Sequence, residues 1–434
     1  MSRAITILLA ACLALPILAA DLSLARKADI FQHDMESRFL LEGQALCKLK
    51  LPDASRDFID YNMPDNAYMT GMYLGALCMK YRVTNDPSDK ADALASLAAL
   101  DKICTASGVP GLWSRAFWPI DKPLADDGVW RPTPDGQYRW RGDVSTDQVD
   151  GVLFGFSWAY DTIAGDPEKA MIRKNVTDLV EYILKNDLVI IGFDGKPTQW
   201  GKYNLKYVRS QERMNALLWL QALKIAAHVT GEPRYADLYR EWALDQGYAE
   251  VAIMARHNLD PQGRGVNHSD DVLQFLAYEP LLRLEEDPEI RAFYEKSLAR
   301  SWNGSDGHPG VAPEGNPFFT YVAAKYLGDE SRLADARNTL AWFPFDLKWN
   351  RDTIARYADA FGFTPNFAPK SPPHTAGEAV PIDRREKSWS ALVMNPYRPA
   401  VENRAQDGPV EYNGHDYLLG YWTGRHYGYL SGAD

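Results

Sequence analysis

The chain has 434 residues, of which 46% are hydrophobic and 12% aromatic, and this composition excludes a mainly disordered protein. Its formal net charge of −11 argues against nucleic acid and anionic lipid as partners, because both are negatively charged themselves. A polyanionic substrate is disfavoured for the same reason, unless a local group of arginines binds it.

Residues 1–20 have the pattern of a secretory signal peptide. Arg3 precedes an apolar run, Ile5–Leu18, that is too short to span a bilayer, and small residues predict cleavage after Ala20 or Ala25. A lipoprotein box ending at Cys12 is the less favoured alternative. We therefore expect a secreted or periplasmic protein that is not held in a membrane after signal removal.

Three cysteines remain after the signal, Cys47, Cys78 and Cys104. An odd number allows at most one disulfide, and scattered cysteines in a chain of this size mostly pack in the core.

Apolar helical stretches alternate with short acidic corners. The corners are Thr84–Pro87, Ala164–Pro167, Thr230–Pro233, Glu285–Pro288 and Leu327–Glu330. At such a corner Gly or Asn ends one helix, the acidic residue caps the next helix, and Pro suits its first position. The corners predict helical hairpins.

The predicted helices are Ala28–Lys48, Asp65–Tyr81, Ser88–Ala106, Ser145–Ile163, Pro167–Lys185, Gln211–Val229, Pro233–His257, Ser269–Leu284, Pro288–Trp302, Asn316–Tyr326, Glu330–Phe343 and Asp416–Leu430. Strand signals are few and short, and residues 361–411 are Pro-rich and irregular. The last helix is rich in aromatic residues.

The corners are unequally spaced, which excludes a strict solenoid. The simplest closed arrangement is all-α: six hairpins in a ring, an (α/α) toroid, that forms one domain over residues 21–434. The other ends of the hairpins are joined by long loops near residues 108–142, 187–210, 258–267 and 303–315. Long ordered loops at one end of a scaffold usually include the functional residues.

This architecture resembles that of carbohydrate-active toroid enzymes: glucoamylase-like hydrolases, unsaturated glucuronyl hydrolases and several polysaccharide lyases. The segments GDVSTDQ, NHSDD and DYLLGYWTGRHYG also resemble an exported bacterial family of unknown chemistry. The resemblance is one of architecture and implies no catalytic residue at any particular position.

The helix entries at the loop end all contain carboxylates, and a closed ring would gather them around one mouth. The segment Arg141–Asp161 combines such an entry with a buried helix, in which Ser145 and Gln148 form a predicted capping box, and Gly151 and Gly155 allow close approach of another helix. The predicted catalytic residues are Asp147, Asp271, His268, Asp270 and Glu212. We expect Asp147 to face Asp270 or Asp271 across the mouth, although carboxylates at helix entries also serve as simple caps.

Residues near the same mouth are predicted to bind the substrate: Asp143, Asp150, Arg141, Trp140, Arg213, Asp65, Trp200 and Tyr203. Aromatic rings mixed with Arg and Asp suit the faces and hydroxyls of sugars. The alternative is that the loop aromatics pack as a small core of their own.

His268 lies between Asn267 and two acids, but the spaced ligands of a zinc site and the oxygen pattern of a calcium loop are absent. We therefore predict no metal and no cofactor, and expect His268 to transfer protons or to bind a sugar hydroxyl.

Three function classes remain open. The first is a glycoside hydrolase acting on an oligo- or polysaccharide through paired carboxylates. The second is a uronate polysaccharide lyase, for which Arg141, His268 and loop tyrosines would serve. The third is a non-catalytic saccharide-binding or polysaccharide export protein. The sequence leaves the sugar, the linkage and the oligomeric state open.

Overall fold

In the computed structural model six pairs of helices form a closed ring, and the description covers residues 22–256, 267–305, 308–365, 370–390, 392, 395–400 and 408–434. The predicted signal peptide lies outside these residues, as does most of the predicted loop 258–267. In the part of the chain that is described, no helix is both long and apolar enough to cross a membrane.

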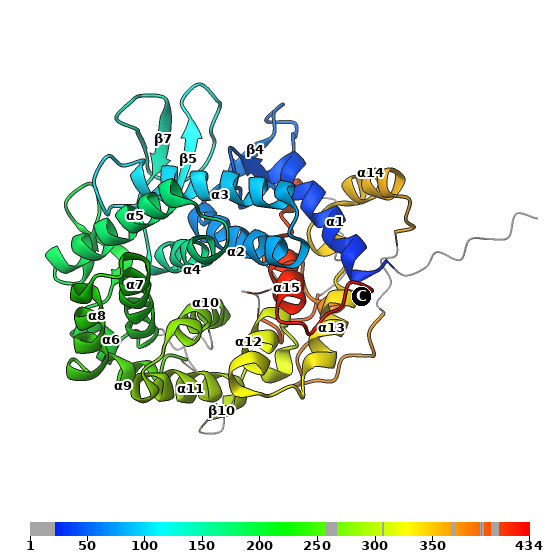
Figure 1. The fold of residues 1–434 in the computed structure, drawn as a ribbon. Helices are drawn as coiled ribbons and strands as arrows, with labels where there is room; N and C mark the ends of the chain where they lie inside the picture. The colour runs from blue at the N-terminus through cyan, green and yellow to red at the C-terminus, as the bar shows by residue number, and fades with distance from the viewer. Residues whose placement is uncertain are drawn as a thin grey trace, which may run out of the picture.

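Six inner helices surround the centre, and Figure 1 looks into their ring. They are α2 (Asn66–Thr84), α4 (Thr146–Thr162), α7 (Met214–Thr230), α10 (His268–Leu284), α12 (Pro317–Leu327) and α15 (His415–His426). Each packs against the next one in this order, and α15 packs against α2 and closes the ring. The inner helices are apolar on nearly every side, because they contact both the ring interior and an outer helix.

Each inner helix pairs with one outer helix. The outer helices are α3 (Pro87–Thr105), α5 (Asp166–Lys185), α8 (Pro233–Arg240), α11 (Pro288–Asn303), α13 (Leu333–Trp342) and, for α15, α1 (Leu24–Asp34). The two ends of the chain therefore form the sixth pair. The predicted all-α toroid is confirmed, with five hairpins and a sixth pair formed by the chain ends.

The predicted corners are confirmed as tight turns between paired helices, with differences in detail. Asn85, Gly231 and Gly328 end their helices in the left-handed conformation, as expected. Gly165 does not: it has a φ of −83° and is the N-cap of α5. Asp86 and Asp287 accept hydrogen bonds from the backbone of α3 and α11, as predicted caps should.

Two long predicted helices are wrong in part. Ala28–Lys48 ends early, because a π-helical turn (Met35–Phe39) follows α1 and a tight turn at Glu42 and Gly43 then starts strands. Pro233–His257 is interrupted after a π-helical turn (Glu241–Asp245) by the left-handed Gly247, and α9 (Tyr248–Ala252) follows.

Short elements fill the long loops. The remaining helices are α6 (Leu205–Ser210), α14 (Arg351–Phe361) and the 3₁₀ turns Ala312–Glu314, Phe345–Leu347 and Ile382–Arg384. The strands are β1 (Leu40–Leu41), β2 (Gln44–Ala45), β3 (Lys48–Lys50), β4 (Asp60–Asn62), β5 (Ala116–Pro119), β6 (Trp130–Pro132), β7 (Tyr138–Arg141), β8 (Val189–Ile191), β9 (Pro197–Lys202), β10 (Gly304–Ser305), β11 (His308–Pro309) and β12 (Val410–Tyr412). Helix α14 and most of these strands were not predicted.

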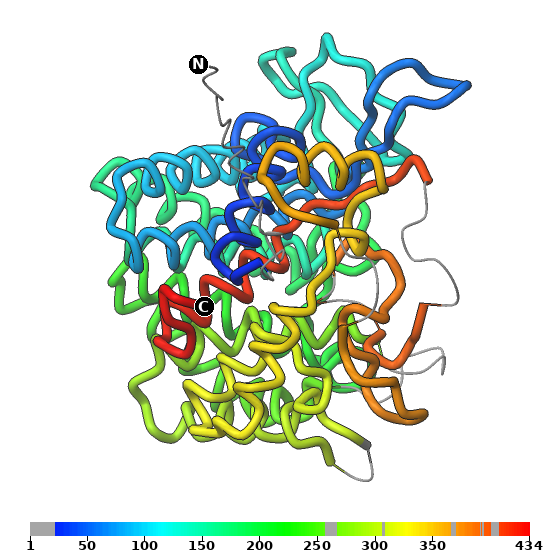
Figure 2. Tube along the Cα trace, turned by 90° about the vertical axis from the view of Figure 1, so that its right-hand side faces the viewer, coloured from blue at the N-terminus to red at the C-terminus, as the bar shows by residue number. Residues whose placement is uncertain are grey.

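The strands form five small antiparallel sheets, in the orders β1-β2, β12-β3-β4, β5-β7-β6, β8-β9 and β10-β11. Figure 2 shows the orange segment after α13 along one end of the ring, on the side where the red helix α15 begins. The hydrophobic core is one connected cluster that extends from Leu24 to Leu430. Cys47, Cys78 and Cys104 are buried free thiols within it.

Candidate functional site

The inner helices α2 and α4 approach each other unusually closely, because glycines form their contact. A Cβ built on Gly151 would lie 2.6 Å from the carbonyl oxygen of Tyr68, and one built on Gly155 would lie 2.8 Å from that of Gly71. A Cβ on Gly71 would overlap the carbonyl oxygen of Gly151. The predicted groove at Gly151 and Gly155 is confirmed, and it brings the first turns of α2 and α4 side by side.

Asp65 and Asp147 lie at these two first turns and share one hydrogen-bond donor. The Gln148 amide nitrogen is 3.1 Å from Asp65 Oδ1 and 3.5 Å from Asp147 Oδ2, so these two oxygens can be no farther apart than the sum of those distances. Burial, followed by the charge of Asp147, raises the pKa of Asp65 to about 6. The two carboxyl groups therefore form an electrostatically coupled pair.

The predicted capping box at Ser145 is wrong. Ser145 is the N-cap residue of α4, but its hydroxyl donates to Asp147 and accepts from Arg115 at 2.9 Å. Gln148 reaches across to Asp65 instead of back to Ser145. Side chains that could have capped their own helix thus orient the carboxylate pair.

A group of buried polar side chains lies near this pair, beginning with Asp150, one turn after Asp147 on α4. Asp150 is fully buried, and neither of its carboxyl oxygens has a hydrogen-bond partner among the described residues. The same holds for the hydroxyls of Tyr68 and Tyr203. Burial raises the pKa of Asp150 well above its usual range; the nearby Gln221 side chain opposes this shift, and the charge of Asp147 adds to it. Buried polar groups of this kind normally bind water or a ligand.

The Tyr68 hydroxyl is close enough to several acidic side chains for their charges to affect its pKa. Burial raises the pKa of the Tyr68 hydroxyl far above its usual value, and four carboxylates add to the effect: Asp150, Asp147, Asp65 and Asp270. The hydroxyl therefore lies within electrostatic reach of helix entries on α2, α4 and α10.

Asp270 and Glu212 extend the acidic group to the entries of α10 and α7. Burial and the charges of Glu212 and Asp271 raise the pKa of Asp270 well above its usual range, and Asp147 contributes as well. The entries of four inner helices thus share one end of the ring. The outer helices of the same pairs begin at the other end, with Pro87, Asp166, Pro233 and Pro288, and Pro167 follows directly in α5. This confirms the predicted separation of the two ends.

His268 and Asp271 form a second cluster with Glu314, which lies in the 3₁₀ turn before α12. His268 Nδ1 is 3.7 Å from Asp271 Oδ2 and 3.8 Å from Glu314 Oε1. Arg256 makes a buried ion pair with Asp271, with Nε 2.8 Å from Oδ1. Burial and the charge of Asp271 raise the pKa of Glu314 well above its usual range.

Several predicted substrate-binding residues have structural contacts instead. Arg141 pairs with Asp126 at 2.6 Å, and the same carboxylate accepts hydrogen bonds from Asn62 and from the backbone of Met63. Trp140 is buried in the β5-β7-β6 sheet. The prediction that these two side chains face a ligand is wrong, because neither is available at the mouth.

The other predicted residues differ in exposure. Asp143 is exposed, has a φ of +57°, and accepts a hydrogen bond from the backbone of Gln199 at 3.2 Å. Arg213 is exposed at the start of α7. Trp200 on β9 is 48% exposed, whereas Tyr203 is fully buried beside Asp150. Of the predicted loop rings, Trp200 is thus available for stacking, and Tyr203 can offer only its hydroxyl.

Sequence analysis missed Tyr68, Gln148 and Glu314 as site residues. Tyr68 and Gln148 each lie in the first turn of an inner helix, close to a carboxylate that was singled out. The sequence feature that could have identified them is a polar or phenolic side chain in the first turn of an otherwise apolar helix. For Glu314 there was a weaker signal, its place in the entry Pro313–Asn316.

Comparison with known proteins gives structural likeness alone. No family model matches the chain, and no curated protein matches its sequence. A solved D-mannose isomerase is 13% identical, with 94% of this chain and 97% of that chain covered and a TM-score of 0.46. A cellobiose 2-epimerase from Spirochaeta thermophila is 12% identical over 93% and 97% of the two chains, with a TM-score of 0.44. An unsaturated glucuronyl hydrolase specific for heparin is 12% identical over 93% and 95%, with a TM-score of 0.43.

Proposed function

We propose that the chain is a carbohydrate-active enzyme, and specifically a glycoside hydrolase that acts on a neutral oligo- or polysaccharide. The observation that supports this most directly is the pair Asp65 and Asp147, two carboxyl groups on neighbouring helix entries with one of them raised to a pKa of about 6. Hydrolysis of a glycosidic bond needs one carboxyl group that retains a proton and one that is ionised.

In this mechanism Asp65 is the general acid. Its raised pKa keeps it protonated in weakly acidic solution, so that it can protonate the leaving-group oxygen. Asp147 is assigned as the base or nucleophile, because it is the second carboxyl group of the pair. It activates a water molecule or attacks the anomeric carbon directly, depending on the separation of the two groups when a sugar is bound.

The remaining polar groups suit the hydroxyls of a sugar. The Asp150 carboxyl and the Tyr68 and Tyr203 hydroxyls are buried and lack partners among the described residues, so substrate hydroxyls or ordered water would complete their hydrogen bonds. Trp200 offers an exposed ring at the loop end for stacking on a sugar face.

The charge at the mouth argues against the lyase alternative. The acidic group there contains Asp65, Asp147, Asp150, Glu212 and Asp270. A uronate would bring a further negative charge into a group whose neighbouring charges already raise the pKa values of Asp65, Asp150 and Asp270, so its binding there is disfavoured. Two arginines that could neutralise it, Arg141 and Arg256, already pair with aspartates.

The test is product formation from a panel of neutral and uronate polysaccharides. We expect new reducing ends from a neutral polysaccharide without ultraviolet absorbance. Absorbance of an unsaturated uronate would establish the lyase instead, and measurable binding without any product would establish a non-catalytic saccharide-binding protein.

Asp147→Asn provides the matched test of the mechanism. It keeps the shape of the side chain but removes the charge, and we expect turnover to fall on the order of a hundredfold or more with little change in stability. Asp86→Asn, the same change at the opposite end of the ring, should leave turnover normal, because Asp86 caps α3. Normal turnover in the Asp147 variant, or an equal loss in both variants, would contradict the proposal.

A further inference from the structure

The second cluster, His268, Asp271 and Glu314, consists of groups that are known to bind metal ions. His268 and Asp271 are three residues apart and share one face of α10, and Glu314 reaches them from the 3₁₀ turn before α12. One nitrogen and two oxygens, one from each side chain, all lie within 4.8 Å of one another.

These ligand atoms are buried and incompletely satisfied. Asp271 is 2% exposed and Glu314 is 7% exposed. His268 Nδ1 and Glu314 Oε1 are buried without a hydrogen-bond partner among the described residues. Buried polar atoms are rarely left without a partner, and these two lie 3.8 Å apart, so a ligand that contacts both would satisfy them.

We propose that His268, Asp271 and Glu314 bind one divalent transition-metal ion through Nδ1, Oδ2 and Oε1. An imidazole nitrogen with two carboxylate oxygens is a ligand set suited to Zn²⁺ or Mn²⁺, with water at the remaining positions. The ion would satisfy the two orphaned atoms and the Asp271 oxygen between them. This proposal differs from the prediction of no metal made from the sequence, where the third ligand, Glu314, was not recognised because it comes from a distant segment.

Two arginines lie near the cluster, and one of them, Arg256, pairs with the ligand Asp271 itself. Arg256 bonds most closely to Asp271 Oδ1, at 2.8 Å, with a weaker contact of 3.4 Å to Oδ2, and it also donates to the carbonyl of Pro309. Its contact orients the Asp271 carboxylate, as outer-shell partners of metal ligands commonly do.

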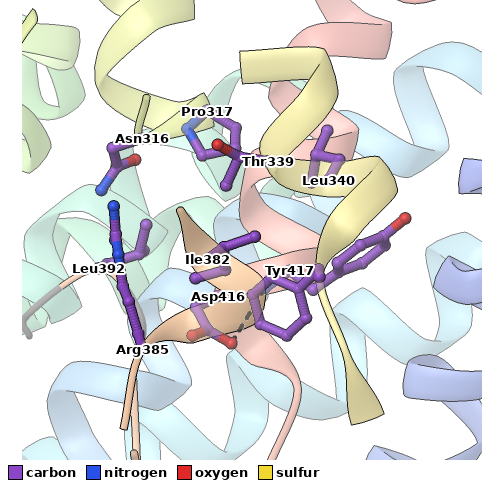
Figure 3. A pocket seen from close by; sticks show the side chains of 10 residues that line it. Asn316, Pro317, Thr339, Leu340, Ile382, Arg385, Leu392, Asp416 and Tyr417 are labelled. Atoms are coloured by element: carbon purple, nitrogen blue, oxygen red, sulfur yellow. Dashed lines mark hydrogen bonds between the residues drawn. The ribbon is translucent and has the colours of Figure 1, made fainter. Parts of the chain in front are cut away.

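Arg385 donates to the carbonyl oxygens of Val380 and Glu314, at 2.7 and 2.8 Å. Figure 3 shows its side chain directed toward Asn316, in a narrow pocket that it lines with Pro317, Ile382 and Leu392. Both guanidinium charges oppose a cation, so we expect binding that a chelator reverses.

The test is metal binding by the chelator-treated full chain, measured by titration calorimetry with ZnCl₂ and with MnCl₂ at pH 7.5. We expect one equivalent of at least one ion and a rise in melting temperature on its addition. His268→Asn and Glu314→Gln should each remove that equivalent. His228→Asn is the matched control, because His228 pairs with Asp161 at 2.7 Å near the ends of α7 and α4, away from the start of α10, and the change should leave binding unchanged.

If Glu314→Gln fails to fold, the half-buried His268 variant decides the question. Absence of binding to the wild-type chain, or the same stoichiometry and affinity in the His268 variant, would overturn the proposal. The readout is binding itself, so it is independent of whether the chain hydrolyses a saccharide.

Discussion

Replacing Asp65 by Asn tests the proposed acid through stability as well as activity. The pKa of Asp65 rises from 3.8 to about 6 on folding, because the carboxyl is buried and lies beside the charge of Asp147. The folded protein therefore binds this proton more tightly than the unfolded chain does. The resulting stability is fully present below about pH 4 and is lost as the pH rises through about 6.

The size of the effect follows from the shift. A shift of about two pKa units, at about 1.4 kcal/mol each, corresponds to about 3 kcal/mol. Above pH 7, where Asp65 is ionised, this group lowers the free energy of unfolding by about this amount relative to pH 4. Asn cannot ionise, yet its oxygen can still accept the hydrogen bond from Gln148. We expect Asp65→Asn to be about 1–3 kcal/mol more stable than the wild type at pH 7.5 and to gain little at pH 4.

Urea unfolding at pH 4, 5.5 and 7.5 measures this difference, and turnover is measured alongside. The variant should lose turnover on the order of a hundredfold while it gains stability. Asp86→Asn is the control of opposite sign, because hydrogen bonds from Ser88 lower the pKa of Asp86. A stability difference that does not change with pH would refute the raised pKa, and retained turnover would refute the role as acid.

Three further outcomes are expected. Gly71→Ala should lower the free energy of unfolding by roughly 1–3 kcal/mol or more in chemical denaturation, because its methyl group overlaps the backbone of α4; an unchanged value would mean that α2 and α4 are farther apart. Lys348→Met should lower it by about 3–5 kcal/mol, because Lys348 Nζ lies 2.8 Å from Asp416 with both side chains fully buried; addition of Asp416→Leu should recover most of the loss, and no recovery would contradict the pairing. When the chain is expressed in a bacterium, we expect it outside the cytoplasm and shortened by residues 1–20 or 1–25, which an intact-mass measurement would detect. A chain that keeps these residues would contradict the predicted signal peptide.

The fold was predictable where the signals are local. An Asn or Gly followed by an acid and a Pro specifies a corner within a few residues, and corners such as Asn85–Pro87 are where the sequence placed them. The prediction of Ala28–Lys48 as one helix was wrong for a tertiary reason. Gly43, at φ +86°, lies so close to the backbone of α3 that a Cβ would overlap Ala95. The apolar pattern of the sequence continues through this turn, so it does not indicate that the helix ends.

The site was predictable only as a set of helix entries. A closed ring makes the entries of the inner helices converge. The glycines of α4 predicted a close approach by another helix, but not that this helix would be α2. Glu314 could not be assigned to His268 in the same way, because no periodicity relates a 3₁₀ turn to a helix that begins far earlier in the chain. Arg141 was predicted at the mouth from its place beside Asp143, but the strand β7 directs it to Asp126.

The same residue type has opposite roles at the two ends of the hairpins, and the direction of the pKa shift distinguishes them. Asp86 and Asp287 accept hydrogen bonds from backbone N–H groups of the helices they begin, and these bonds lower their pKa values. Asp65 occupies the corresponding position at α2, yet its side chain makes no capping hydrogen bond within the described residues, and its pKa is raised. Spacing from the helix start is nearly identical in all three cases, so sequence cannot separate a cap from a site residue. Asp65 is held instead by Gln148 and Arg115, which belong to other segments, while burial beside Asp147 raises its pKa. A carboxyl group positioned by neighbouring segments and shifted toward its protonated form is the pattern expected of a site residue and not of a cap.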